Sequence, residues 1–95
     1  ALLCPVAMAT AFPHCKPGSS LEVDGNDESY WMLPAHGAVF NYSSHPALTI
    51  PCGQDGNGLP IGLQLVGRKW SEARLLGIAA AIATLGGGFG RPPGY

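Results

Sequence analysis

The sequence predicts an α/β fold, in which a β-hairpin is combined with helices. Two short apolar segments, residues 47–53 and 59–67, are separated by Asp-Gly and Asn-Gly dipeptides, which readily adopt the positive φ angles of hairpin turns. Further along, residues 71–85 carry no charge after their first turn and end before a run of glycines, which is typical of a buried helix. Strands and helices are therefore both expected.

The hairpin predicted over residues 47–67 has one strand with a clear alternation of side chains. Leucine and isoleucine recur at every second position, so one face of this strand is expected to enter a core. That face carries Leu59, Ile61, Leu63 and Leu65, and the other carries Pro60, Gly62, Gln64 and Val66. Pro51 cannot donate a ladder hydrogen bond, so we expect an edge, a bulge or a strand end there.

The N-terminal part combines a short apolar segment with a polar one. Residues 2–6 predict a buried strand rather than a signal peptide, because an initiator Met and a basic leader are missing and Pro5 interrupts the segment. Residues 13–29 hold four of the six acidic residues and many turn formers, so we expect a long solvent-facing loop. Such a loop can border a substrate entrance, but a solvated connector is favoured because its charges follow no pattern.

Residues 30–44 predict helical structure with a broad apolar stripe. Pro34 and Gly37 interrupt the pattern, so either two short helices or one kinked helix is expected. Asn41 lies near the end of this stretch, where a buried amide could hold two backbone segments together or reach a ligand. The bracing role is the favoured interpretation.

The last predicted element is a helix over residues 71–85. Ser71 is placed to cap its N-terminus by accepting a hydrogen bond from a first-turn N–H, and Glu72 favours the positive end of the helix dipole. The glycines after Leu85 should end the helix, and residues 86–95 should form a tail. Beyond Arg74 the helix is apolar nearly all round, so we expect other polypeptide to cover most of its surface.

Composition argues against several classes of function. The net charge is −1 and the five Lys and Arg residues are scattered, so neither nucleic-acid binding nor membrane binding is predicted. Three cysteines cannot form a complete set of disulfides, and a reducing, cytoplasmic location is expected. These cysteines and the histidines His14, His36 and His45 lack metal-ligand spacing, so neither a metal nor a cofactor is predicted.

One pattern in the sequence resembles a known enzyme family. Its strongest part, Gly58 to Gln64, reads Gly-Leu-Pro-Ile-Gly-Leu-Gln, and the match continues through Leu-Val-Gly to Gly67. The other matching positions are Leu2 to Val6, Phe12-Pro13-His14, Asn41, Pro46-Ala47, Pro51-Cys52-Gly53, Glu72 and Leu75-Leu76. Together they resemble the C-terminal region of amidase-signature enzymes, over most of residues 2–85. The resemblance implies a part of a large mixed sheet flanked by helices.

The resemblance also implies a chemistry, the hydrolysis of a carbon–nitrogen bond in a small amide substrate. Members of that family attack amides with a serine that a second serine and a lysine activate. Those residues lie in a Gly/Ser-rich core that no stretch of this chain matches. The serine pairs Ser19-Ser20 and Ser43-Ser44 are expected to be ordinary loop residues. No catalytic residue is therefore predicted in this chain.

Three residues are candidates for contact with substrate. His45 stands where the family usually has an aliphatic residue, as Ser44 stands for a usual glycine, and this histidine would add a polar group near the first hairpin strand. Trp31 and Asn41 complete the set.

Two hypotheses of different classes follow. In the first, the chain is the C-terminal structural and pocket-wall segment of an amide hydrolase whose remaining N-terminal part carries the catalytic residues. In the second, it is a non-catalytic module that covers its apolar helix by oligomerising or by binding a partner. Alone, the chain is expected to be inactive.

Overall fold

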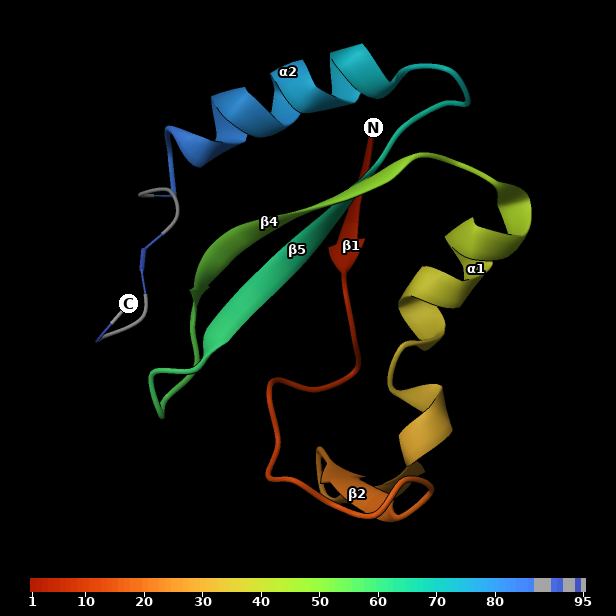
Figure 1. Ribbon diagram of the computed structural model, residues 1–95, viewed down its shortest axis with the longest axis vertical. Coiled ribbons are helices and arrows are strands. Elements are labelled where there is room, and N and C mark those ends of the chain that lie inside the picture. The colour runs from red at the N-terminus through yellow and green to blue at the C-terminus, as the bar shows by residue number, and fades with distance from the viewer. Residues whose placement is uncertain (87–89, 92–93, 95) are drawn as a thin grey trace.

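The computed structural model describes residues 1–86, 90, 91 and 94 and contains both helices and strands (Figure 1). In chain order the elements are β1 (Leu2–Pro5), β2 (Ser20–Val23), β3 (Asn26–Ser29), the 3₁₀-helix η1 (Tyr30–Met32), α1 (Ala35–Ser43), β4 (Ala47–Gln54), β5 (Pro60–Val66) and α2 (Glu72–Ala83). The predicted combination of α and β structure is confirmed. No helix in the described part of the chain has the length and apolar character needed to cross a bilayer.

β1, β5 and β4 form an antiparallel sheet with β5 in the centre (Figure 1). β4 and β5 are the two arms of a hairpin, paired from Ala47 opposite Val66 to Gln54 opposite Pro60. Their register shifts between Pro51 and Gly53, which leaves Cys52 as the extra residue of a β-bulge. The interruption expected at the proline is therefore present, in the form of a bulge.

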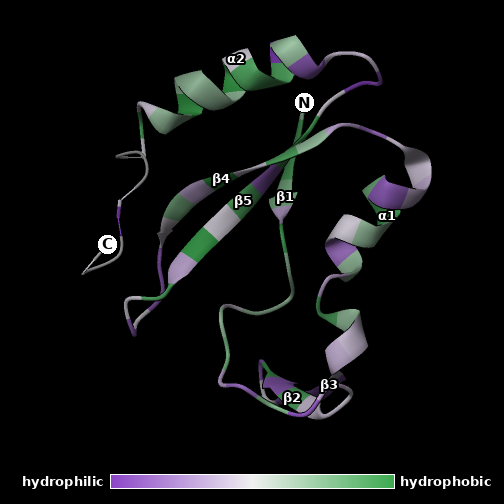
Figure 2. Cartoon of the chain, in the orientation of Figure 1, coloured by the Kyte–Doolittle hydropathy of each residue, from purple (hydrophilic) through white to green (hydrophobic). Residues whose placement is uncertain are grey.

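The core lies between this sheet and α2, which covers one sheet face (Figures 1 and 2). Leu65 is the most deeply buried side chain, with 2% of its surface exposed. It clusters with Ile50 of β4 and with Leu75 and Ala79 of α2. Burial of an aliphatic side chain of this size contributes about 1.5–3 kcal/mol. The partly buried residues around the cluster are Leu48, Leu63, Ile78 and Ile82.

The opposite face of β5 is also covered near its C-terminal end, so the prediction of a single buried face is wrong there. Gln64 and Val66 are only 7% and 5% exposed. A Cβ built on Gly37 of α1 would lie 4.0 Å from Gln64 Oε1, which shows that α1 approaches this face. The buried amide of Gln64 donates to Cys4 Sγ across 3.5 Å. Alternation alone treats a glutamine between leucines as solvent-facing, and the covering helix reverses that assignment.

Residues 20–29 form a second hairpin, so the long loop predicted over residues 13–29 is also wrong. β2 and β3 pair antiparallel, from Ser20 opposite Ser29 to Val23 opposite Asn26. The turn residues Asp24 and Gly25 have φ angles of 52° and 79°. Positive φ at both central positions matches the right-handed twist of the flanking strands, and Asp-Gly is a preferred dipeptide for such turns.

The helical stretch predicted over residues 30–44 consists of two short helices, η1 and α1, with Leu33 and Pro34 between them. Leu33 is buried, and its carbonyl accepts a hydrogen bond from Met8 N at 3.0 Å. This bond ties the loop after β1 to the start of α1. Ser44 ends α1 in the left-handed region, with φ 57°.

Ser71 precedes α2 but does not cap it through its side chain, contrary to the prediction. Its φ and ψ of −118° and 29° are outside the extended region that a capping residue normally adopts, and its Oγ donates to Arg68 O at 2.6 Å instead. The helix ends at Ala83, earlier than the predicted Leu85. The tail predicted over residues 86–95 lies largely outside the described residues.

Candidate functional site

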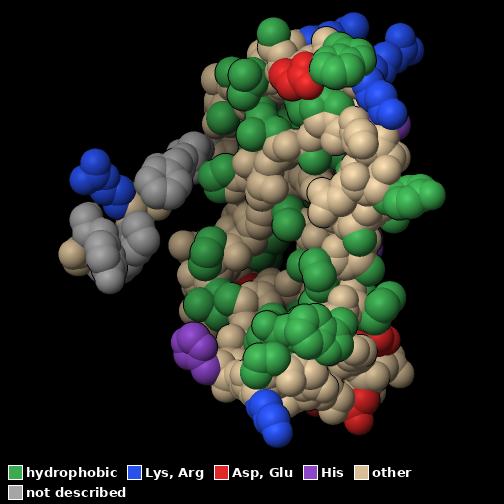
Figure 3. Space-filling model, turned by 45° about the vertical axis from the view of Figure 1, so that its right-hand side comes forward, with side chains coloured by type: hydrophobic (Ala, Val, Ile, Leu, Met, Phe, Trp, Pro, Cys, Tyr) green, Lys and Arg blue, Asp and Glu red, His purple; other side chains and the backbone are tan. Residues whose placement is uncertain are grey.

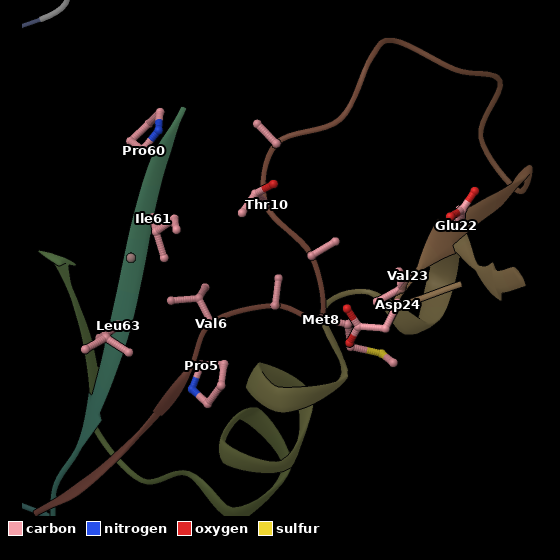
Figure 4. A pocket seen from close by; sticks show the side chains of 14 residues that line it. Pro5, Val6, Met8, Thr10, Glu22, Val23, Asp24, Pro60, Ile61 and Leu63 are labelled. Carbon is pink, nitrogen blue, oxygen red and sulfur yellow. The ribbon is translucent and has the colours of Figure 1, made fainter. Parts of the chain in front are cut away.

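An open hollow of about 690 Å³ lies beside the first half of β5, and we call it the β5 groove (Figure 4). The loop after β1 forms one wall, and β2 with its turn forms another. In Figure 4, the labelled side chains of Val6 and Ile61 both point into the hollow. The lining residues are Pro5 to Ala11, Glu22 to Asp24 and Pro60 to Leu63.

The β5 groove combines an apolar surface with an acidic side. Val6, Ile61 and Leu63 supply aliphatic groups, whereas Glu22 and Asp24 bring two carboxylates from the β2–β3 hairpin. No Lys or Arg is among the described residues that line it. The groove is therefore suited to an apolar group that also carries a positive charge.

Asp55 ties the β4–β5 turn to the wall of the β5 groove. Its Oδ1 accepts hydrogen bonds from the backbone N–H groups of Asn57 and Leu59, both at 2.8 Å. Its Oδ2 accepts from Thr10 Oγ1, a groove residue, at 3.2 Å. These bonds, the Leu59 N–H first among them, hold the pKa of Asp55 below its usual value.

We expect the stability of the chain to fall in acid partly through Asp55. Because the folded-state pKa is lowered, the contribution of this carboxylate is complete above its unfolded pKa of 3.8 and is lost as the pH falls through the folded value. Urea unfolding from about pH 7 to about pH 2 should show this loss. Asp55→Asn should weaken the decline, because its amide oxygen can accept the same N–H bonds without titrating. An identical pH dependence in the variant would contradict the role of Asp55.

The three predicted substrate-side residues do not converge on one site. Trp31 lies before α1, where its Nε1 is 3.5 Å from a Cβ built on Gly18 and its ring meets Tyr30 edge to face at 5.2 Å. Asn41 and His45 lie at the other end of α1, and neither lines the β5 groove. Asn41 is exposed, so the buried bracing role predicted for it is wrong.

His45 borders a different, smaller hollow of about 370 Å³. Its Nδ1 lies 2.9 Å from Ser43 Oγ, which in turn approaches Phe40 O at 3.4 Å. Phe40 and Val66 give this hollow an apolar surface, and Arg68 adds a positive charge. The arrangement can hold a small group by packing and by polar contacts with the imidazole.

Neither serine pair forms a candidate nucleophilic centre. Ser43 is the last residue of α1, Ser44 ends that helix, and Ser20 is the first residue of β2. Ser44 lies in the turn that ends α1, and Ser19 lies outside the helices and strands, where its N–H donates to Lys16 O at 3.0 Å. The prediction of loop serines is therefore wrong for Ser20 and Ser43. Within the described residues, no group of three or more His, Cys, Asp or Glu side chains could hold a metal ion.

Sequence reasoning did not identify the residues of the β5 groove. The charges of residues 13–29 follow no pattern and predict a loop around Glu22 and Asp24, although the Asp24-Gly25 dipeptide favours a hairpin that would fix their positions. The wall from Val6 to Ala11 has no comparable signal in the sequence, because its place depends on the Met8 to Leu33 hydrogen bond.

A match to a family of known proteins identifies the class of protein. The Amidase family matches residues 1–76, which extend from β1 to the first part of α2. The chain therefore belongs to the amidase family.

Among its relatives are enzymes from plants and bacteria. It is 47% identical over 73 residues to a fatty acid amide hydrolase from Oryza sativa subsp. indica, a match that covers 73% of this chain and 12% of the relative. It is 34% identical over 92 residues to a glutamyl-tRNA(Gln) amidotransferase subunit from Roseobacter denitrificans, covering 97% of this chain and 18% of the relative. The chain thus spans less than a fifth of the length of these relatives.

Proposed function

We propose that this chain is the C-terminal structural and pocket-wall segment of an amide hydrolase that cleaves carbon–nitrogen bonds, and that a Ser-Ser-Lys catalytic set lies outside it. The observation that carries this proposal is the position of the family block. Gly58 to Gly67 includes the whole of β5, the central strand, and Leu65 and Val66 are deeply buried there. The block therefore acts as scaffold, and it offers no nucleophile.

More large apolar side chains are exposed than buried, which supports the proposal that this chain is part of a larger folded domain. Six apolar residues of the described chain are buried, whereas eleven large apolar side chains are exposed. Leu76 is 60% exposed on the outer side of α2, and Leu2 and Leu3 are about half exposed on β1. So many large exposed apolar side chains are typical of a surface that other polypeptide covers. The remaining N-terminal part of an amidase would cover it.

In this proposal the substrate is a small amide, and the chain supplies part of its pocket wall. His45, with the apolar hollow beside it, is the best placed of the three candidates. Trp31 and Asn41 stay proposed contacts, since both are exposed and available to groups from outside the chain. The three free cysteines are compatible with a reducing, cytoplasmic setting, which belongs to the same proposal.

A chimera tests the proposal. Residues 1–76 would replace the aligned segment of the rice fatty acid amide hydrolase, and release of ammonia from a fatty acid primary amide would be measured. We expect the chimera to keep at least about a tenth of the parental kcat/KM, a loss of no more than about 1.4 kcal/mol. The isolated chain should give no hydrolysis above buffer, and the rice enzyme without the segment serves as control.

Two results would contradict the proposal. Hydrolysis by the isolated chain would show that its own residues catalyse the reaction. A chimera that folds cooperatively but lacks all activity would show that the segment does not complete the pocket.

The second candidate function is a non-catalytic module that self-associates or binds a partner. The exposed side of α2 favours it, because Leu76, Gly77 and Ala80 leave an apolar surface against which another helix could pack. Both functions need the same surface to be covered.

A further inference from the structure

We propose that the chain associates head to tail with a second copy, through insertion of Trp70 of one copy into the β5 groove of the next. The inference does not depend on the proposed hydrolase function, because it uses two surfaces that the amide-cleaving role leaves unassigned. One is the segment before α2, and the other is the acidic groove described above.

Trp70 is the anchor of the first surface. Its side chain is 90% exposed, and its φ angle is 63°. A bulky residue in the left-handed region is a backbone outlier. Such strain is retained where it has a use, and here it holds an indole ring out into solvent. Tryptophan is also the residue type most typical of interface hot spots.

Positive charge surrounds this tryptophan. Arg68 and Lys69 precede it, and both are exposed. Arg74 lies in the first part of α2, so three of the five cationic residues of the chain fall within seven positions. Glu72 is the one acidic residue between them. The end of the molecule at which α2 begins is therefore basic, and Figure 3 shows Lys and Arg side chains gathered there.

The β5 groove has the complementary properties. Its 690 Å³ is within the roughly 300–1,000 Å³ range of pockets that take small organic groups, and Val6, Ile61 and Leu63 can contact a ring. Glu22 lines it and lies directly opposite Asp27 in the β2–β3 ladder. Two like charges in such a pair repel one another, so an incoming cation relieves a cost that the free chain retains.

The two surfaces lie at opposite ends of the same molecule. The β2–β3 hairpin is at one end of the view in Figure 1, and the segment that leads into α2 is at the other. A chain cannot fill its own groove with its own Trp70, so the contact must join different copies. Insertion in one direction leaves a free surface at each end and extends to rings or open chains, whereas reciprocal insertion between two copies closes a symmetric dimer. Charge complementarity within one sequence favours a second copy as the occupant.

Sedimentation equilibrium of the full chain tests this proposal. We expect the average mass to rise above the 9.8 kDa of the monomer between roughly 5 μM and roughly 500 μM protein in about 0.05 M salt, and to rise less in about 0.5 M salt. Trp70→Ala should weaken association at least about tenfold. Tyr42→Ala is the matched control, because Tyr42 is a 95% exposed aromatic residue that lines neither surface.

Charge reversal makes the test specific. A variant with Glu22→Arg and Asp27→Arg has two basic ends, and a variant with Arg68→Glu and Lys69→Glu has two acidic ends. Each should be monomeric alone, and an equimolar mixture should associate again. Far-UV circular dichroism confirms that the variants fold, since all four altered side chains are exposed.

The proposal has clear contrary outcomes. A wild-type chain that stays monomeric at all concentrations overturns it. So does association that survives Trp70→Ala but is lost in Leu76→Ala, because the contact would then use the outer side of α2. Failure of the mixed variants to associate would exclude the acidic groove as the acceptor.

Discussion

Leu65→Ala is expected to destabilise the chain by about 2–5 kcal/mol, because the side chain that it truncates is the most completely buried one. Leu65 lies near the C-terminal end of β5, the central strand, and packs with the core residues of both β4 and α2. The sheet cannot close around the resulting cavity without breaking its pairing on two sides. Small domains have only about 5–15 kcal/mol of total stability, so this loss is a large fraction.

Urea unfolding of the two chains measures the effect of Leu65→Ala. The matched control is Leu76→Ala on the outer side of α2, where the leucine is 60% exposed and the expected change is within about 0.5 kcal/mol. Equal losses in both variants would mean that α2 does not pack on the sheet with the orientation described.

Gly62→Ala is expected to cost about 1–3 kcal/mol although alanine is the smallest possible addition. A Cβ at this position would lie 2.9 Å from Thr49 Cγ2, 3.5 Å from Val6 Cγ2 and 3.6 Å from Ile50 O. Thr49 is β-branched and cannot rotate freely away, so the strands must separate slightly. Space at Gly62 is therefore what allows β4 and the loop after β1 to meet over β5.

A double-mutant cycle isolates this close contact. Thr49→Ser removes Cγ2, so the loss caused by Gly62→Ala should be clearly smaller in a Thr49→Ser background. Gly53→Ala in β4 is the control, because nothing lies within 4 Å of a Cβ built there. If the two glycine variants were equally unstable, the cause would be general to glycine positions and not the contact with Thr49.

The sequence predicts the β4–β5 hairpin well because two independent signals agree. The turn residues from Asp55 to Gly58 tolerate positive φ, and the alternation from Leu59 to Leu65 has the period of a strand. The β2–β3 hairpin has the turn signal at Asp24-Gly25, but its apolar alternation is limited to Leu21 and Val23 of β2, and β3 is wholly polar. A turn without a core face is easily mistaken for a loop.

The candidate site is less predictable, because it depends on tertiary placement. Trp31 and His45 lie at opposite ends of α1. No pattern along the chain predicts that this helix keeps the two residues apart. Ser71 has the residue type of a helix cap, but its backbone angles direct its hydroxyl to Arg68. Residue type limits which roles are possible, and the backbone decides between them.

The bulge at Cys52 has a consequence for how this chain behaves in concentrated solution. β4 is an outer strand of its sheet, so in the described part of the chain one side of its backbone has no strand partner. An exposed strand of this kind is a template for fibril-like stacking. Pro51 removes one N–H donor from β4, and the extra residue at Cys52 bends the strand next to it. These two residues therefore reduce strand-to-strand aggregation. This protection matters because the chain keeps much of its apolar surface exposed.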